Sequence, residues 1–344
     1  MAEAVKGPLP EQDVRVDVAS IEKQLAELWR AEKSEKDGAI TRAALWNVVA
    51  HTWSSQQHAH AAEVLAKASA SVPQRTIVVE ADPRGDAGIA SWISANCHLI
   101  GGGRQVCSEE IAIVASGEQV HHVAPLVNAL LLPDMPVAVW WLGDLPDAHH
   151  EYAETLLEPA DRLIVDSSHF SGAPDLDLVL RIAEQTTTAP ADLNWARIEE
   201  WRAATASLFD PPSMRNWLQA IRGVRVSSGG DASFGASSEG LLYVAWLTAQ
   251  SGVEVQFELA SAGGENGIRS IELRFEDGSL ATVRRDHGSG AVIASAEGNE
   301  TPSLDCVTRS LAHDTDDLIV RLLKRPEADR VYLKALKVAR RLAA

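Results

Sequence analysis

The chain has 344 residues, of which 46% are hydrophobic, and its 31 basic and 48 acidic side chains give a net charge of -17. This length predicts two domains, each with its own core. A surface this acidic disfavours binding to nucleic-acid phosphates and anionic lipid, so we expect neither nucleic acid nor a membrane as partner. The charged residues 1–18 lack the apolar core of a signal peptide, and no apolar run approaches the roughly 20 residues that span a bilayer.

Three cysteines, Cys97, Cys107 and Cys306, form an odd set without a closely spaced pair. This pattern predicts free thiols in a reducing compartment, so we expect a cytoplasmic protein without a disulfide framework. A redox-active thiol is one interpretation. The favoured one is a small apolar side chain in the core, because free cysteines are among the most buried residues.

Helix-like and strand-like segments alternate in the first half, after a charged stretch at residues 1–19 that we expect to be loosely ordered. Helices are predicted from Ser20 onward and at residues 56–71, 120–132, 148–157 and 175–184. Strands are predicted at residues 43–52, 76–80, 110–115, 137–141 and 163–166. This alternation indicates an α/β domain with a largely parallel sheet, which we place at residues 20–188.

A polar break at residues 186–190 is the predicted linker to a second domain at residues 189–344. The helix after it carries an apolar stripe from Trp195 to Leu208 and ends before two prolines. Strands are predicted at residues 224–226, 253–259, 268–275, 279–284 and 291–296, with a hairpin turn at 276–279. A helix at 241–250 interrupts them, and two helices close the chain. This pattern indicates an α+β domain with an antiparallel sheet.

Two prolines and two tryptophans mark the most informative segment of the chain. Pro133 and Pro136 bracket an acidic turn at Asp134, and the apolar run that follows ends in Trp140 and Trp141. Adjacent strand residues point to opposite faces, so this strand has to be covered on both sides. We expect one ring in the core and the other, Trp141, at the less covered end of the sheet near a partner.

The sequence lacks the usual catalytic and nucleotide-binding motifs. The glycines at 101–103 lack the GxGxxG spacing and read as a hairpin loop, and neither a P-loop nor a GxSxG motif occurs. The segment 227–240 is small and flexible and leads into a helix; an anion site is one interpretation, and a solvated linker is the favoured one. We therefore expect no catalytic residue and no cofactor.

Histidines are the most prominent metal-binding candidates. They occur at His51, His58 and His60 and as adjacent pairs at 121–122 and 149–150. Residues spaced by one or two positions diverge on a helix, and HExxH is absent. Surface or helix-cap histidines are therefore the favoured interpretation, and we expect no metal.

Two further features are candidates for function. Asp166 follows a predicted strand at its carboxyl end, where ligands bind in open α/β sheets; a catalytic base is one interpretation, and a helix cap or an ion pair with Arg162 is preferred. The C-terminal helix combines an apolar stripe with basic residues that include Lys334 and Arg341. It is expected either to dock on an acidic partner or to pack on its own domain.

Three segments, taken in order, resemble one protein family. They are Pro-Asp-Met-Pro with the following Trp-Trp at 133–141, Ala-Asp-Arg-Leu-Ile-Val-Asp-Ser at 160–167, and Asp-Leu-Asn-Trp-Ala-Arg at 192–197, continuing through Trp201-Arg202 to Phe209-Asp210-Pro211. They resemble the glucose-6-phosphate dehydrogenase assembly proteins, the OpcA family. The resemblance implies a non-catalytic effector that binds this dehydrogenase and promotes its oligomer assembly or activation in the oxidative pentose phosphate pathway.

Two functional hypotheses therefore remain. The first is this effector, with partner-interface candidates at Trp141, Asp134, Asp166, Lys334 and Arg341. The second is an α/β enzyme or sensor that binds a sugar-phosphate; it depends only on the fold class and the 227–240 segment. Fold class does not decide between them.

Overall fold

The computed structural model describes residues 14–35, 40–100, 104–145, 151–230, 233–264, 266–286, 288–297, 304–309 and 311–343. The chain forms two compact units. Unit 1 comprises Met1–Val165, Thr187–Pro190 and Thr315–Glu327, and unit 2 comprises Asp166–Thr186, Ala191–Asp314 and Ala328–Ala344. The chain thus passes between the units several times, and the predicted single boundary at residue 188 stays a prediction.

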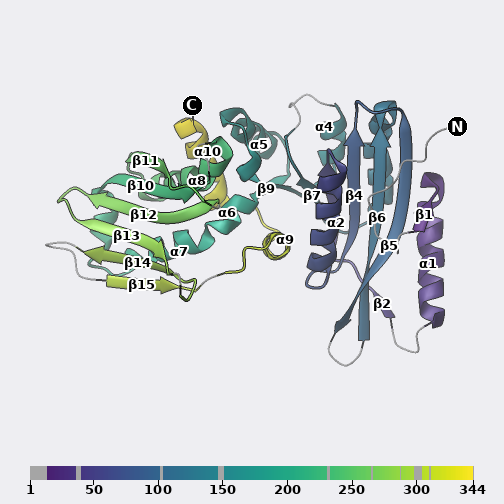
Figure 1. The fold of residues 1–344 in the computed structure, drawn as a ribbon, viewed down its shortest axis with the longest axis horizontal. Helices are drawn as coiled ribbons and strands as arrows, with labels where there is room; N and C mark the ends of the chain where they lie inside the picture. Colours follow the sequence, from purple (N-terminus) through teal and green to yellow (C-terminus); the bar gives the residue numbers. More distant parts are fainter. Residues whose placement is uncertain are drawn as a thin grey trace. The chain divides into compact units, whose positions relative to one another are not determined.

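Unit 1 is built on a mostly parallel sheet with the strand order β1-β5-β6-β4-β3-β7-β8-β9 (Figure 1). Along this order the strands are Val14–Val16, Gly88–Ile100, Arg104–Ser116, Gln74–Asp82, Trp46–Thr52, Val137–Trp141, Arg162–Val165 and Ala189–Asp192. Strands β6, β4, β3, β7 and β8 are parallel, whereas β5 is antiparallel to β6 and β1 to β5. The short β2 (Ile40–Arg42) pairs in parallel with β6. The predicted parallel α/β architecture is confirmed.

The helices of unit 1 follow from amphipathic segments between these strands. They are α1 (Ile21–Glu35), α2 (Ser55–Ser69), α3 (Val123–Leu130), α4 (Glu151–Leu157) and α9 (Thr315–Leu323), with 3-10 turns at Val18–Ser20 and Gly117–His122. Helix α2 packs on β3 and β4, and α3 packs on α4 (Figure 1). Because helices cover the parallel strands, all seven residues of β3 and all five of β7 are buried.

The structure differs from the sequence predictions for unit 1 at three places. Strand β5 was missed, because its apolar residues alternate with polar ones and with small residues that do not look strand-like. Residues 186–190 are not only a linker, since β9 begins at Ala189. Cys97 and Cys107 lie directly opposite each other on β5 and β6 and form a disulfide, so they are not free thiols.

Unit 2 contains a mixed, mostly antiparallel sheet in the order β11-β10-β12-β13-β14-β15. Along this order the strands are Gln256–Ser261, Ile221–Gly229, Gly267–Phe275, Leu280–Arg285, Val292–Glu297 and Leu304–Thr308. Only the β10–β11 pair is parallel. The predicted hairpin at 276–279 joins β12 to β13, and Gly278 has the positive φ of 84° that such a turn favours. The α+β prediction is confirmed, although the short β15 was missed.

Helices cover one face of this sheet (Figure 1). Unit 2 has α5 (Ala173–Gln185), α6 (Leu193–Arg197), α7 (Glu199–Leu208), α8 (Phe234–Ser251) and α10 (Arg330–Ala343), with 3-10 turns at Ser167–His169 and Arg215–Ala220. Helix α8 packs on β10, β11 and β12, and α7 packs on β13, β14 and β15. Helix α8 starts seven residues before the predicted helix at 241, because Ser233 caps it and accepts from the Ala236 N–H. Most of the predicted flexible segment 227–240 is therefore regular structure, apart from residues 231–232, which lie outside the described residues.

Among the described residues, no helix has both the length and the apolar content to cross a membrane. The predictions for residues 1–13, for the glycines at 101–103 and for His149 and His150 fall outside the described residues.

Both tryptophans of β7 should behave as core residues. Trp140 is 2% exposed and Trp141 is 1% exposed, so the expectation that Trp141 is the less covered ring is wrong. We expect Trp140→Ala and Trp141→Ala each to lower the free energy of unfolding by about 3–5 kcal/mol, since each leaves a large cavity. Urea denaturation followed by circular dichroism measures this change. The matched control is Trp217→Ala, because Trp217 is only half-buried; a loss below about 1 kcal/mol for Trp141→Ala would contradict the burial.

Candidate functional site

The carboxyl end of the unit 1 sheet is the first place to look for a ligand. Strand β3 leads through α2 to β4 on one side, whereas the chain leaving β6 passes through α3 to β7 on the other side of β3. The strand order therefore reverses between β3 and β7. In open α/β sheets, ligands bind beyond the carboxyl ends of the strands at such a point.

Aromatic side chains of the protein itself occupy this position. The His51 ring at the end of β3 stacks on the Trp141 ring at the end of β7, with centroids 3.9 Å apart, and meets the Trp53 ring edge-on at 4.4 Å. Tyr152 lies 5.5 Å from His51. The indole N–H groups of Trp53 and Trp141 both donate to the carbonyl oxygen of Asp144 at 3.0 Å. We call these four side chains the aromatic plug.

The helix that follows β3 does not offer its first turn to a phosphate. The Trp53 N–H donates to Gln57 Oε1 at 2.8 Å, and the Gln57 N–H donates to the capping hydroxyl of Ser54 at 3.3 Å. Dinucleotide sites need free N–H groups here, and glycines that let the backbone approach the pyrophosphate. The turn from β3 into α2 carries Thr52, Trp53 and Ser54 instead.

Two of the histidines, His51 and His58, are buried and not at the surface as expected, whereas His60, His121 and His122 are exposed. His51 and His58 are both fully buried. Burial lowers the pKa of His58 to about 4, so this ring is neutral at physiological pH, and its Nδ1 lies 3.9 Å from a carboxylate oxygen of Glu80. In the described part of the chain, no group of three or more His, Cys, Asp or Glu side chains has an arrangement that could hold a metal ion.

The opposite, amino end of the same strands carries the loop that contains the Pro-Asp-Met-Pro motif. We call residues 131–136 the signature loop. Asn47 is fully buried on β3 and accepts a hydrogen bond from the Leu132 N–H at 2.8 Å. It also donates to the carbonyl oxygens of Leu132 at 3.0 Å and Met135 at 3.3 Å. At the exposed tip, Asp134 has a φ of 63°. A non-glycine residue seldom adopts this conformation, so a side chain dedicated to the loop holds an unusual backbone in place.

A hollow of about 340 Å³ lies beside the signature loop; we call it the signature hollow. Its apolar walls come from Ala43, Ala44, Leu132, Pro133 and Met135, and its polar lining from Arg42, Gln74, Arg75 and Glu109. Arg75 and Glu109 are 2% and 3% exposed and form an ion pair at 2.7 Å.

Both members of this buried pair have further partners. Arg75 also donates to Glu22 at 2.5 Å and to the Leu130 carbonyl at 2.6 Å. Glu109 also accepts from Trp29 at 2.5 Å and pairs with Arg42 at 2.8 Å. The two buried charges are therefore compensated within unit 1.

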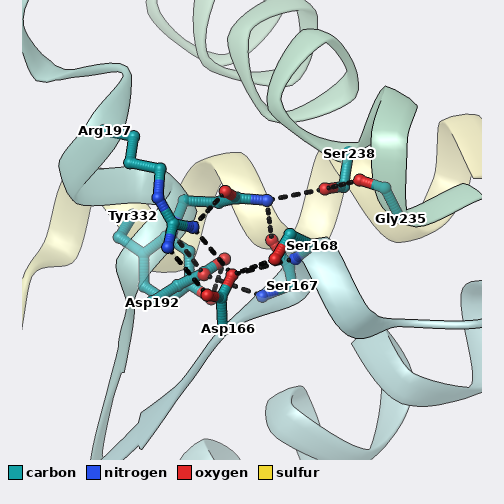
Figure 2. A network of polar contacts seen from close by, with 9 residues as sticks. Asp166, Ser167, Ser168, Asp192, Arg197, Gly235, Ser238 and Tyr332 are labelled. Carbon is teal, nitrogen blue, oxygen red and sulfur yellow. Dashed lines mark hydrogen bonds and ion pairs between the residues drawn. The ribbon is translucent and has the colours of Figure 1, made fainter. Parts of the chain in front are cut away.

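In unit 2, the second and third motif segments meet in one network of polar contacts (Figure 2). The Asp166 carboxylate forms a two-pronged ion pair with the Arg197 guanidinium, with both N–O distances at 2.8 Å. The Asn194 amide donates to the hydroxyls of Ser167 at 3.2 Å and Ser238 at 2.7 Å. The network thus ties the turn after β8, the start of α6 and the first turn of α8 together.

A second carboxylate lies at the base of this network. Asp192 is fully buried and accepts from the N–H groups of Ser167 at 3.1 Å and Asn194 at 2.9 Å. The Tyr332 hydroxyl of α10 donates to it at 3.4 Å. Burial and the nearby charge of Asp166 raise the pKa of Asp192 to about 6. Burial also acts on Asp166, but the hydrogen bond and charge of Arg197 outweigh it and hold the pKa of Asp166 below its ordinary value.

A glycine permits the close approach of α8 to this network. A Cβ added at Gly235 would lie 2.1 Å from the carbonyl oxygen of Ser168. No side chain fits there, so the start of α8 is pressed against the turn that carries Asp166. The network is closely packed, and its charged groups pair with one another.

The five interface candidates are divided between the two units. Trp141 and Asp134 belong to unit 1, at opposite ends of β7, and only Asp134 is exposed. Asp166, Lys334 and Arg341 belong to unit 2. Asp166 pairs with Arg197 and not with Arg162, which donates to the carbonyls of Leu322 and Glu327. Their role at a partner interface stays a prediction.

The basic helix α10 packs on its own unit, against α5 and α8. Tyr332, Ala335, Leu336 and Ala339 form its buried stripe. Three of its basic residues pair with acids of the same unit: Lys337 with Glu184, Arg340 with Asp177, and Arg341 with Glu254. Lys334 is exposed.

Sequence reasoning missed the residues that organise both units. Arg75 and Glu109 received no role, although a charged residue inside or beside an apolar strand is a signal that a buried partner exists. Asp192, Asn194 and Arg197 were quoted in a motif without a function. The available signal was that Asp166 and Asp192 each directly precede a helical segment, as N-cap residues do.

The two halves of the chain match the two models of one protein family. Residues 65–181 match the glucose-6-phosphate dehydrogenase subunit N-terminal domain, and residues 188–336 match the corresponding C-terminal domain. The chain belongs to the OpcA family of glucose-6-phosphate dehydrogenase assembly proteins.

Curated relatives carry the same family name. The putative OxPP cycle protein OpcA of Synechococcus elongatus is 30% identical over 234 residues, which cover 65% of this chain and 51% of that protein. The protein of the same name from Synechocystis sp. is 31% identical over 186 residues, 53% of this chain and 38% of that one. The match therefore spans about half, or less, of the length of these relatives.

Solved structures give only distant similarity. Levoglucosan dehydrogenase in its apo form has a TM-score of 0.47 at 11% identity, over 86% of this chain and 94% of that one. A 3-ketoreductase from Actinomadura kijaniata has a TM-score of 0.46 at 11% identity, over 88% and 96%. Scores this low carry no argument about this chain.

The pKa of Asp192 predicts a pH-dependent stability. Because the folded pKa of about 6 lies above the ordinary 3.8, the folded state binds this proton more tightly than the unfolded state. Its contribution is fully present below about pH 4 and is lost as the pH rises through about 6. Between these values, the unsubstituted chain should lose about 2 kcal/mol of unfolding free energy relative to Asp192→Asn, which keeps the acceptor oxygen.

Urea denaturation at several pH values between 4 and 7 measures this difference. The matched control is Asp305→Asn, because Asp305 is exposed. Parallel pH profiles for the unsubstituted chain and Asp192→Asn would contradict the raised pKa.

Proposed function

We propose that this chain is a non-catalytic protein that binds glucose-6-phosphate dehydrogenase and promotes its oligomer assembly or activation. The observation that carries the proposal is the match of both halves, residues 65–181 and 188–336, to the two domains of the OpcA family. The relatives named OxPP cycle proteins support a role in the oxidative pentose phosphate pathway, and we place this role in the cytoplasm.

The aromatic plug supports a non-catalytic role. In a dinucleotide enzyme of parallel α/β architecture, the cofactor lies where the strand order reverses. Here His51 and Trp141 are 0% and 1% exposed at that position, and their rings stack. The side chains that hold the core together thus fill the place that a cofactor needs.

The charged networks support the same proposal. A general acid or base has to reach a substrate and keep a pKa suited to proton transfer. The Asp166 carboxylate is instead engaged by Arg197 and Ser168, and its pKa is lowered. The raised pKa of Asp192 belongs to a fully buried side chain whose partners are Ser167, Asn194 and Tyr332.

The sugar-phosphate hypothesis is not favoured by the segment that suggested it. That hypothesis needed open N–H groups at the start of the helix after residue 233. The first turn of α8 is capped by Ser233 and packed through Gly235 against Ser168.

Activity and assembly measurements test the proposal. The purified chain should not reduce NAD or NADP with glucose 6-phosphate. Added to its host's dehydrogenase, it should raise the specific activity or shift the dehydrogenase to a larger oligomer, with saturation near a fixed stoichiometry. Coupled absorbance assays and light scattering after size exclusion measure the two effects.

Serum albumin at equal concentration is the control for non-specific stabilisation. Turnover by the chain alone would contradict the proposal. An unchanged specific activity and oligomer size of the dehydrogenase across the whole titration would contradict it as well.

A further inference from the structure

The signature hollow combines apolar walls with charged side chains in its lining. Its volume of about 340 Å³ exceeds the space of one large side chain, and five of its lining residues are apolar. Binding pockets typically combine apolar walls with a few placed polar groups. The hollow also has charged side chains in its lining that are almost wholly buried, Arg75 and Glu109.

The wall formed by the signature loop is fixed before any partner arrives. Asn47 donates two hydrogen bonds to the loop and accepts one from it, and the tip residue Asp134 has a positive φ. A rigid wall loses little conformational entropy on association, which favours binding. Backbone outliers of this kind cluster at functional sites.

The polar lining favours a carboxylate in the occupant. Arg75 and Glu109 are engaged by each other and by Glu22, Leu130 and Trp29. Arg42 is different, because its side chain is 47% exposed and its one ion pair among the described residues uses a single nitrogen toward Glu109. A guanidinium has five N–H donors, so Arg42 retains donors for an incoming carboxylate.

The apolar surface extends beyond the hollow itself. Leu45 follows the lining residues Ala43 and Ala44 and is 59% exposed, the second most exposed of the large apolar side chains among the described residues. A small ligand inside the hollow would leave Leu45 in water, whereas a protein surface covers both. Interface anchors typically fill such pockets while neighbouring contacts exclude water.

We propose that the signature hollow is the docking site for the dehydrogenase, which inserts an apolar side chain between Ala44 and Met135 while an adjacent carboxylate of the dehydrogenase pairs with Arg42. This inference rests on the proposed function and adds the place of contact and the chemistry of the partner. The buried Trp141 is then not the anchor; the same motif contributes to the interface through the loop that precedes its strand.

Two substitutions test separate parts of the site. Ala44→Phe fills the hollow, and Arg42→Ala removes the exposed cation. Biolayer interferometry with the immobilised host dehydrogenase should show Kd raised at least about tenfold by Ala44→Phe, at both low and high salt. Arg42→Ala should raise Kd about threefold or more at low salt and less at high salt, because ions screen an exposed pair.

Arg84→Ala is the matched control, since Arg84 is an exposed arginine of unit 1 away from the hollow. It should leave Kd within about twofold of the unsubstituted chain. Melting temperatures verify that each variant folds; if Ala44→Phe unfolds the chain, Met135→Ala serves as the second hollow variant and should raise Kd at least about fivefold.

Each outcome decides between the hypotheses. Unchanged Kd for folded Ala44→Phe and Arg42→Ala, with the unsubstituted chain binding normally, overturns the docking site and leaves the proposed function standing. If the hollow variants differ from the unsubstituted chain in molar mass on light scattering, but bind the dehydrogenase with unchanged Kd, the hollow binds a second copy of the chain. That result also overturns the docking site for the dehydrogenase. Lack of binding by the unsubstituted chain overturns the proposed function and this inference together.

Discussion

The parallel strands at the centre of unit 1 are buried on both faces, and the rest of this unit depends on that constraint. Strands β3 and β7 consist entirely of buried residues, so every polar group along and beside them needs a partner inside the protein. At the amino end of β3, the fully buried Asn47 meets this requirement through hydrogen bonds with the signature loop. At the carboxyl end, the indole N–H groups of Trp53 and Trp141 converge on one carbonyl, that of Asp144. Polar groups at both ends of these strands are therefore satisfied within the protein, by the signature loop at the amino end and by the Asp144 carbonyl at the carboxyl end.

The same constraint fills the position where open α/β sheets usually bind a ligand. An open α/β sheet usually leaves a crevice where its strand order reverses, and loops with glycine let a cofactor approach. In unit 1 the crevice carries stacked rings of His51 and Trp141 in place of a cofactor. The open, shaped surface instead lies at the amino ends of the strands, where the signature loop and Arg42 line a hollow. The described hollow of unit 1 thus lies at the other edge of the sheet from the position where its strand order reverses.

Periodic apolar segments made much of the fold predictable from the sequence. The strand Val137–Trp141 was predicted with its observed bounds, because two prolines fix its start and its residues are uniformly apolar. Strand β9 could not be read from the sequence, since its four residues include Pro190 and follow three threonines that are typical of a turn. Its formation depends on tertiary contacts, such as the Ala189 N–H that donates to Asp161 and the Thr188 hydroxyl that donates to Ala160.

The disulfide and the functional surface differ in how far the sequence anticipates them. Cys97 and Cys107 lie symmetrically about Gly102 in the sequence, and the hairpin reading of the three glycines already implied that they face each other. The odd number of cysteines instead favoured the prediction of free thiols in a reducing compartment. No such signal exists for the hollow, because Arg42, Arg75, Glu109 and Met135 come from four separate segments that only the strand order brings together. The double tryptophan does not by itself indicate an interface, because large aromatic side chains are common both in cores and at interfaces, and both rings of β7 are buried. Asp134, which has a positive φ, and Met135, which lines the hollow, lie just before this strand. They belong to the loop that we propose to contact a partner.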